Sequence, residues 1–347
     1  MSDIDIRVEG CAGHITLTRP KALNALTHDM ATAIEAALDA WAADDRVALV
    51  IVDAEGDKAF CAGGDVTTLY EAGRDGDEDQ GRRFWRDEYR LNARIAECPK
   101  PCIAFMQGFT MGGGVGIGCH CAYRVVDDSS RIAMPECAIG LVPDVGGSLL
   151  LARAPGRLGE YLGVTGTRMP AGDAILAGFA DTYIPNLMWP DVIGALIRTG
   201  DPAALSDFAE AAPQSALAER RSRIDTLFAG EGLRDILNAL RADDGDVARE
   251  ALKAMQRNSP LSMACAVEMV HRMRMPGADI RRALELEYRF THRAVARSDF
   301  LEGVRATIID KDQAPRWQHS LDDPPDMAVT QMLMPLGADA LTFEDKE

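Results

Sequence analysis

Two glycine-rich segments, each directly after a strand-length apolar run, constrain this chain more than any other feature. AFCAGGD (residues 59–65) follows the apolar run 47–53, and FTMGGGVGIG (residues 109–118) follows the run 101–106. Glycine lets a backbone adopt positive φ and approach other atoms closely, so each segment predicts a tight turn. The second turn also predicts the start of a helix. A recurring order of strand, glycine turn and helix indicates an α/β fold.

The remaining patterns divide the chain into an α/β part and a helical part. Residues 4–18 alternate with a period of two around Gly10 and Gly13, which predicts two antiparallel strands. Apolar residues at helical spacing follow the N-cap candidate Thr27. We therefore expect a core over 1–186 that carries the site and a mostly helical region over 187–347. Further expected elements are helices at 27–43 and 80–97, short strands at 122–128 and 131–134, helices through 188–309, and an irregular tail from Gln313.

Composition excludes several classes of protein. The 347 residues carry 37 basic and 54 acidic side chains, a net charge of −17, which disfavours nucleic acid and anionic membrane surfaces as partners. No apolar run approaches the roughly 20 residues that a membrane-spanning helix needs. The N-terminal segment has neither the charge nor the apolar stretch of a targeting peptide, so we expect a cytoplasmic protein. Its eight cysteines are then expected to be reduced and buried, without a metal.

The two glycine turns are open to three interpretations. Two turns that meet can aim backbone N–H groups at one point, as in an oxyanion hole. Dinucleotide binding is the rival, although neither turn has the GxGxxG spacing with an acidic residue about 20 positions later. The third interpretation is tight packing of turns with no ligand.

Glu136 and Asp144 form the second candidate feature, in the segment MPECAIGLVPDVGG (residues 134–147). Both acids stand among apolar residues and directly follow prolines. A carboxyl group that loses water in such surroundings has a raised pKa, which suits acid–base or nucleophilic chemistry. The alternative is that each acid caps a helix or pairs with an arginine.

Taken together, these segments resemble the enoyl-CoA hydratase/isomerase (crotonase) superfamily, and within it the branch of the 3-hydroxyisobutyryl-CoA hydrolases. The resemblance extends from about residue 10 to about residue 317 and implies a crotonase-like spiral of ββα units. The superfamily motifs are RPKALNAL, FCAGGD, MGGGVGIG and MPECAIGLVPDVGG, and those of the branch are RDEYRLN, FTMGGGVG, RLGEYLGVTG and IDKDQAPRW.

The resemblance also implies roles for individual residues. It places the oxyanion-binding N–H groups on Gly64 and Gly113 and the catalytic carboxylates on Glu136 and Asp144. Glu88 corresponds to a substrate-contacting acid of the branch, although the sequence around it alone favours a solvated helical charge. The remaining expected substrate contacts are the turn residues Ala62, Gly63, Asp65, Gly112 and Gly114.

The implied reaction is hydrolysis of a short, branched 3-hydroxyacyl-CoA, namely 3-hydroxyisobutyryl-CoA, in valine breakdown. Hydratases carry a glutamate where this chain has Gly116, and a Pro-Gly where it has Pro143 and Asp144. These departures favour a hydrolase over the alternative of a hydratase or isomerase. A non-catalytic acyl-CoA-binding member of the fold is the remaining alternative.

The expected ligand is the acyl-CoA substrate itself, with no separate cofactor and no metal. Lys21 and Lys58, together with Arg19, are candidate contacts for the CoA phosphates because they lie close to the first turns. Members of the superfamily often form trimers or hexamers, but members of the hydrolase branch need not. The expected oligomeric state is therefore either a monomer or a homo-oligomer.

Overall fold

The computed structural model describes residues 3–343, which form two compact units. Of these residues, the first unit comprises 3–64, Asp87–Ala133 and Arg168–Ala216, and the second comprises Asp65–Arg86, Met134–Thr167 and 217–343. Each unit therefore draws on chain from both sides of residue 186. The division into consecutive domains at that residue stays a prediction.

The first unit contains two sheets. The larger has the order β1-β2-β3-β5-β7-β9, and the smaller has the order β4-β6-β8. The pair β1–β2 is antiparallel, as the alternation predicts, whereas the other neighbouring pairs are parallel. The strands are β1 (Ile4–Glu9), β2 (Ala12–Leu17), β3 (Leu49–Ala54), β4 (Ala59–Cys61), β5 (Cys102–Phe105), β6 (Phe109–Met111), β7 (Tyr123–Val126), β8 (Arg131–Ala133) and β9 (Thr182–Tyr183).

From β3 onward, consecutive strands alternate between the two sheets. β3, β5 and β7 extend the larger sheet in turn, and the strand after each of them, β4, β6 or β8, extends the smaller one. Helix α4 (Gly113–Gly118) begins two residues after β6 ends, at the glycine turn. This repetition of strand, strand and helix confirms the predicted α/β spiral.

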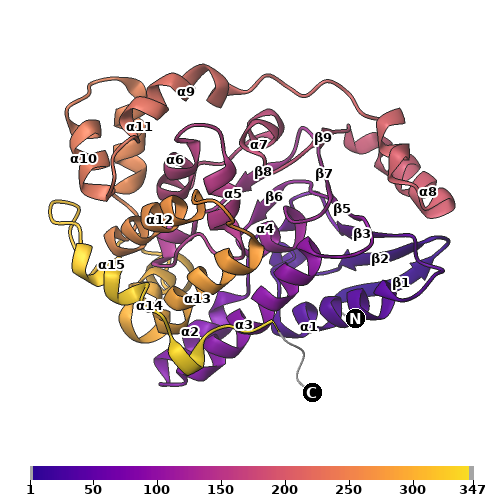
Figure 1. Cartoon of the computed structure of the whole chain (residues 1–347), viewed down its shortest axis with the longest axis horizontal. Coiled ribbons are helices and arrows are strands. Elements are labelled where there is room, and N and C mark those ends of the chain that lie inside the picture. The colour runs from indigo at the N-terminus through magenta and orange to yellow at the C-terminus, as the bar shows by residue number, and fades with distance from the viewer. Residues whose placement is uncertain (1–2, 344–347) are drawn as a thin grey trace. The chain divides into compact units, whose positions relative to one another are not determined.

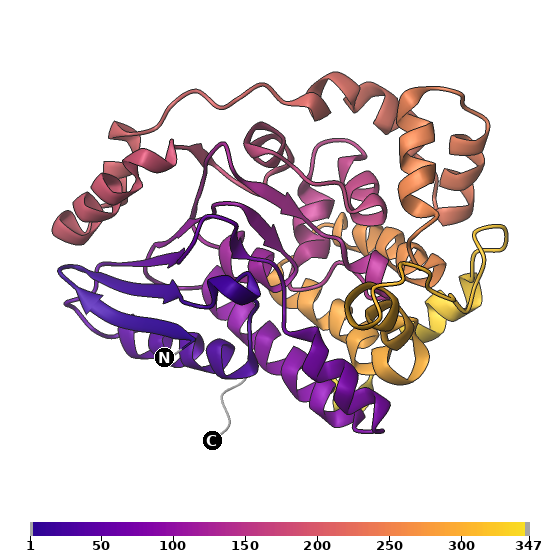
Figure 2. The same cartoon turned by 180° about the vertical axis from the view of Figure 1, so that it is seen from behind.

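Helices cover both faces of the larger sheet (Figures 1 and 2). Successive side chains of a strand point to opposite faces. Ala12 belongs to the apolar cluster that includes Trp189 at the start of α8 (Trp189–Thr199). The next residue, Gly13, faces Trp41 of α1 (His28–Ala42). The other helices of this unit are α7 (Ala171–Ala177), η1 (Pro20–Ala22), η3 (Asn186–Met188) and η4 (Pro202–Asp207).

The second unit is helical. Its α12 packs against α5 and α6 and is buried along most of its length. α3 (Glu78–Ala96) contributes residues to both units, as the ranges above show. The helices here are α2 (Val66–Arg74), α5 (Gly147–Arg153), α6 (Leu158–Thr165), α9 (Ala216–Leu227), α10 (Leu233–Arg241), α11 (Asp246–Met255), α12 (Pro260–Met273), α13 (Ile280–Arg297), α14 (Phe300–Val304), α15 (Asp326–Met332), the 3-10 helices η2 (Glu136–Ile139) and η6 (Gly337–Asp339), and the π-helix η5 (Arg305–Ile309).

Two features differ from the sequence-based expectations. The tail from Gln313 is not irregular throughout, because α15 forms within it and buries Met332. The first glycine-rich segment begins as strand β4, which pairs with β6. Three residues are too few to show a periodic pattern, so only the pairing defines this strand.

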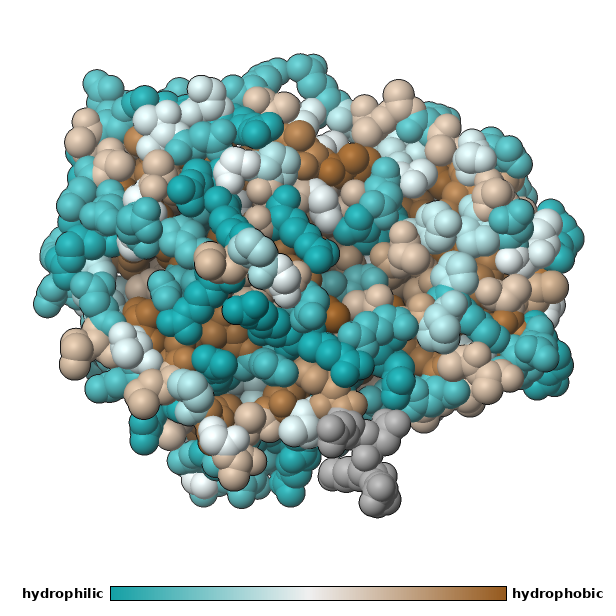
Figure 3. Space-filling model, viewed as in Figure 1, coloured by the Kyte–Doolittle hydropathy of each residue, from teal (hydrophilic) through white to brown (hydrophobic). Residues whose placement is uncertain are grey.

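The structure also shows how apolar the helices and one face of the surface are, and in what state the cysteines lie. No helix among residues 3–343 is both long and apolar enough to cross a bilayer. Figure 3 shows one face of the chain, on which hydrophilic residues predominate and apolar ones form small separate patches. All eight cysteines are free thiols; six are buried, and Cys11 and Cys98 are partly exposed.

Replacing Gly13 with alanine is expected to destabilise the first unit. A Cβ at Gly13 would lie 2.4 Å from the Trp41 ring, which is itself buried. Such overpacking costs about 1–3 kcal/mol. Urea unfolding of Gly13→Ala should show this loss. Gly194→Ala in α8 is the control, because its Cβ would meet only the tip of Arg198 at 3.4 Å. Equal stability of both variants and the unmodified protein would contradict the packing argument.

Candidate active site

The two glycine turns meet in the first unit. α4 begins at Gly113, and its N-cap Gly112 has a φ of 49°. A Cβ on Gly113 would lie 3.3 Å from the backbone nitrogen of Gly64 and 3.5 Å from the carbonyl carbon of Gly63. The turn after β4 and the turn after β6 are therefore in direct contact, as the pairing of these strands requires.

Glycine is required at the point of closest approach. A Cβ on Gly114 would lie 2.1 Å from the carbonyl oxygen of Cys61, a distance that no side chain can occupy. Gly63, in the facing turn, has a φ of 126°, which residues with a side chain rarely adopt. The absence of side chains at these positions lets the start of α4 lie against the end of β4.

Glu88 lies beside this contact and is not a solvated charge. Its side chain on α3 is only 3% exposed, and its Oε1 would be 2.7 Å from a Cβ on Gly113. Burial raises the pKa of the neighbouring Cys61 thiol to about 12, and the charge of Glu88 adds to the rise. Cys61 thus stays a neutral thiol at physiological pH. The carboxyl group of Glu88 is the ionisable group that this part of the unit presents.

The other turn residues and the candidate cations lie as follows. The N–H group of Ala62 donates to the carbonyl of Leu23 at 3.0 Å and thereby fixes the first turn. Asp65 precedes α2 as its N-cap residue and belongs to the second unit. Lys21 and Lys58 are both exposed. Their turns are adjacent, since a Cβ on Gly56 would lie 3.0 Å from Cβ of Pro20.

Arg19 is engaged within the first unit. Its Nη1 donates to the carbonyl of Ala25 at 2.7 Å, and its Nε lies 3.4 Å from Oδ2 of Asp3. These contacts fix the segment before the first turn. Arg19 therefore has a structural role that Lys21 and Lys58, at the surface, do not share.

Glu136 is buried in the second unit. It opens η2, and its side chain is 4% exposed. The next residue, Cys137, has a thiol whose pKa burial raises well above its usual value, with a further contribution from the charge of Glu136. η2 packs against α14 so closely that a Cβ on Gly303 would lie 2.2 Å from the carbonyl carbon of Ile139. The side chain of Glu136 is therefore shielded from solvent, as the sequence predicts.

Asp144 is equally buried and stands at a strained turn of the second unit. Its side chain is 4% exposed. Its carbonyl accepts a hydrogen bond from Gly147 N–H at 2.7 Å. Val145 and Gly146 have φ values of 53° and 81°, so two successive residues are left-handed.

A further buried carboxylate, Glu287 of α13, reaches the same turn. Its Oε2 accepts from Gly146 N–H at 2.7 Å, and its Oε1 accepts from Ser148 N–H at 2.9 Å and from the Ser148 hydroxyl. Sequence reasoning missed both Glu287 and Ser148. The helical period could have indicated Glu287, because it stands three residues after Leu284 and three before Phe290 on the buried face of α13, whereas Glu285 falls on the exposed face.

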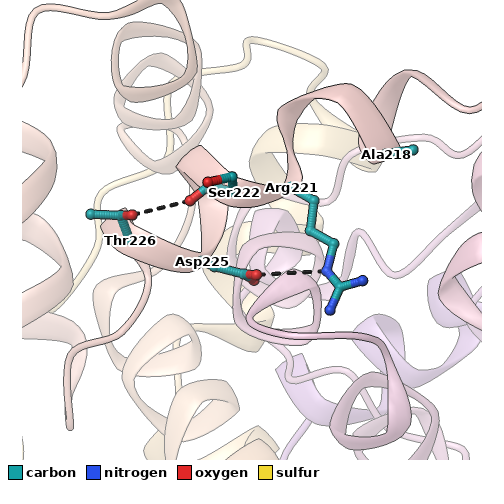
Figure 4. Close-up of a pocket in the computed structure, with 5 residues that line it drawn as sticks. All are labelled: Ala218, Arg221, Ser222, Asp225 and Thr226. Carbon is teal, nitrogen blue, oxygen red and sulfur yellow. Dashed lines mark hydrogen bonds and ion pairs between the residues drawn. The ribbon is translucent and has the colours of Figure 1, made fainter.

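A surface hollow on the second unit lies along a single helix, α9 (Figure 4). There Arg221 extends toward Asp225, with Nε 3.6 Å from Oδ2, and the Thr226 hydroxyl donates to the carbonyl of Ser222 at 3.0 Å. Its fifth lining residue is Ala218. None of the residues singled out in the sequence lines this hollow.

The two sheets, parallel apart from the pair β1–β2 and extended by successive ββα units with glycine turns after β4 and β6, define the crotonase fold. The chain belongs to the enoyl-CoA hydratase/isomerase family, whose model matches residues 12–333. It is 36% identical to the mitochondrial 3-hydroxyisobutyryl-CoA hydrolase of Gallus gallus, over 97% of this chain and 90% of that protein. The corresponding protein of Xenopus laevis is 37% identical over 95% of this chain and 88% of its own length.

Solved structures agree on the fold. A crystal structure of an enoyl-CoA hydratase from Rhodobacter sphaeroides 2.4.1 is 54% identical, with a TM-score of 0.94 over 99% of this chain and 100% of that chain. A crystal structure of a carnitinyl-CoA dehydratase from Mycobacterium thermoresistibile is 41% identical, also with a TM-score of 0.94, over the full length of both chains.

The stability of the protein is expected to fall with rising pH because of Glu287. Burial raises the pKa of this carboxyl group to about 7, against a usual 4.5; the charge of Asp144 raises it further, and hydrogen bonds from Ser148 and Gly146 lower it. The folded chain therefore holds the proton more tightly than the unfolded chain. The resulting stabilisation is complete below pH 4.5 and is lost by about pH 7, a loss of about 3 kcal/mol.

Urea unfolding at pH 5 and pH 8 measures this effect when the unmodified protein is compared with Glu287→Gln. The glutamine cannot ionise, so the difference in free energy of unfolding between the two proteins should change by about 3 kcal/mol between these pH values. Other titrating groups cancel in that comparison. A difference that is the same at both pH values would contradict the assignment.

Proposed function

We propose that this chain hydrolyses a short, branched 3-hydroxyacyl-CoA thioester, with 3-hydroxyisobutyryl-CoA as the substrate and 3-hydroxyisobutyrate and CoA as the products. The observation that carries the proposal is the combination of Glu136 and Asp144, both buried, with relatives named for this hydrolysis over most of both chains.

A difference from hydratases supports hydrolysis. Hydratases of the superfamily carry a glutamate at the position that corresponds to Gly116 of this chain. Gly116 is buried inside α4. A hydratase of the superfamily orients and adds water with two glutamates, and one of them is missing here. Asp144 supplies a second acid at a position where hydratases have glycine. Because the fold is retained while the positions of the acidic residues differ, we expect a reaction other than hydration.

The mechanism begins with attack on the thioester carbonyl. Glu136 either attacks the carbonyl carbon itself or takes a proton from the attacking water. The carbonyl oxygen becomes an oxyanion, which the N–H groups of Gly64 and Gly113 stabilise. The carbon–sulfur bond then breaks, and the CoA thiolate leaves with a proton from solvent or from Asp144. Water supplies the oxygen of the product acid, by direct attack or by opening an acyl-enzyme anhydride.

Substrate recognition is assigned to the groups around the glycine turns. Glu88, buried beside Gly113, is suited to accept a hydrogen bond from a substrate hydroxyl. Lys21 and Lys58 supply positive charge for the CoA phosphates on a chain whose net charge is −17. The reaction needs no separate cofactor, since CoA is part of the substrate.

Enoyl-CoA hydration is the second candidate. The crystal structure that is 54% identical is described as an enoyl-CoA hydratase, and the one that is 41% identical as a carnitinyl-CoA dehydratase. Crotonyl-CoA distinguishes the two reactions. Hydration removes the enoyl absorbance without releasing thiol, whereas a thioesterase releases thiol from 3-hydroxyisobutyryl-CoA and 3-hydroxypropionyl-CoA. Rapid hydration with no thiol release from any ester would replace the proposal.

Glu136→Gln and Asp144→Asn are each expected to lower kcat for thiol release by about 10²–10⁴, because each removes a proton-transferring or nucleophilic carboxylate. Affinity for CoA, measured by calorimetry, should change little. Asp173→Asn is the control: Asp173 is also buried, accepts a hydrogen bond from Ser215, and has no place in the mechanism. Wild-type turnover by both active-site variants would show that the carboxylates are wrongly assigned.

A further inference from the structure

Glu287 is a buried carboxylate that the proposed hydrolysis does not use. It lies in the middle of α13 with no exposed surface, among Leu284, Leu286 and Phe290, which are buried as well. A carboxyl group is costly to bury, and it is retained in an apolar helix face only where hydrogen bonds offset the cost. Its contacts therefore indicate what it does.

Three donor groups that closely follow Asp144 bind the side chain of Glu287. The N–H of Gly146, the N–H of Ser148 and the Ser148 hydroxyl all donate to its two oxygens. Donors at both oxygens fit the ionised carboxylate, which is the form of Glu287 above its pKa of about 7. A glutamine amide would accept with its oxygen but turn its NH2 group toward another donor.

The turn that Glu287 holds is one that the local sequence disfavours. Val145, directly after Asp144, has a φ of 53°, and a β-branched residue rarely adopts this conformation. Such a residue persists only where its surroundings fix it. The bonds from Gly146 and Ser148 to Glu287 fix the backbone on the far side of Val145, and the bond from Gly147 N–H to the Asp144 carbonyl closes the turn.

We propose that Glu287 is a positioning residue for Asp144: by holding the turn through residue 148, it keeps the Asp144 carboxylate in the orientation that thioester hydrolysis requires. This inference rests on the proposed function, because it takes Asp144 as a participant in the reaction. It assigns Glu287 no contact with the substrate.

Glu287→Gln is expected to lower kcat for thiol release by about 10- to 100-fold, a size typical of a misplaced catalytic group, with KM changed less than about threefold. Ser148→Ala removes one donor of three and should lower kcat by about three- to tenfold. Both are measured at a temperature where circular dichroism shows the variant to be folded.

Glu160→Gln is the matched control. Glu160 is the same residue type in the same unit, also has no exposed surface, and is held by Arg157, Arg274 and His271. Its pKa is lowered; burial alone would raise it, and the bonds from His271 and Arg157 outweigh burial. This variant should lose stability while its folded molecules keep the wild-type kcat. An equal fall in kcat in Glu287→Gln and Glu160→Gln would show that Glu287 has only a general packing role.

A double-mutant cycle tests whether Glu287 acts through Asp144. Residues that act as one unit give non-additive losses. In the Asp144→Asn background, Glu287→Gln should therefore cost less than threefold in kcat. The same factor in both backgrounds would overturn the inference while leaving the proposed function intact. Wild-type turnover by Asp144→Asn, or no thiol release by the unmodified protein, would overturn both. If Glu287→Gln does not fold, the same cycle with Ser148→Ala decides.

Discussion

The approach of the α4 backbone to the end of β4 is the contact on which the first unit's site depends. A Cβ on Gly114 would fall 2.1 Å from the Cys61 carbonyl oxygen, and one on Gly113 would fall 3.3 Å from the Gly64 nitrogen. Side chains at these places would separate the two turns. The parallel pairing of β4 with β6 brings the strand ends to the same edge, and the glycines let the turns that follow them touch. Glu88 becomes buried as a consequence of this closeness.

In the second unit, buried acids are stabilised by hydrogen-bond donors and by cationic side chains. Asp144 stands at a turn whose backbone amides are held by Glu287, and Glu160 is surrounded by Arg157, Arg274 and His271. The pKa of Glu160 is lowered, whereas that of Glu287 is raised to about 7. The difference follows from the partners, since Glu160 faces positive charges and Glu287 faces neutral donors and another acid.

The relation between fold and reaction in this family depends on a few positions. Proteins described as a hydratase and as a dehydratase share the fold of this chain at a TM-score of 0.94. Fold similarity at this level therefore does not choose between adding water to a double bond and hydrolysing a thioester. In the mechanism proposed above, the choice depends on which positions of the retained fold carry carboxyl groups. Gly116 and Asp144 are the positions on which the proposal of hydrolysis rests.

The sequence by itself determined the elements whose signals are local. The antiparallel pair β1–β2, the helix that begins after Thr27, the buried strands, the glycine turns and the start of α4 all follow from period, capping and glycine content. It also singled out Glu136 and Asp144, and both side chains are buried. These features were predictable because each is encoded within about ten neighbouring residues.

Only the tertiary structure decided which distant residues meet. The smaller sheet joins β4, β6 and β8, of which only β8 lies in a segment that the sequence predicts as a strand (residues 131–134), and α15 in the tail is stabilised by burial of Met332. Glu88 resembled a solvated charge and is buried, and Glu287 is buried although Glu285, two residues earlier, is exposed. The helical period indicates which acids lie on the apolar face of a helix. The groups that cover that face, and therefore the partners of Glu88 and Glu287, come from distant parts of the chain.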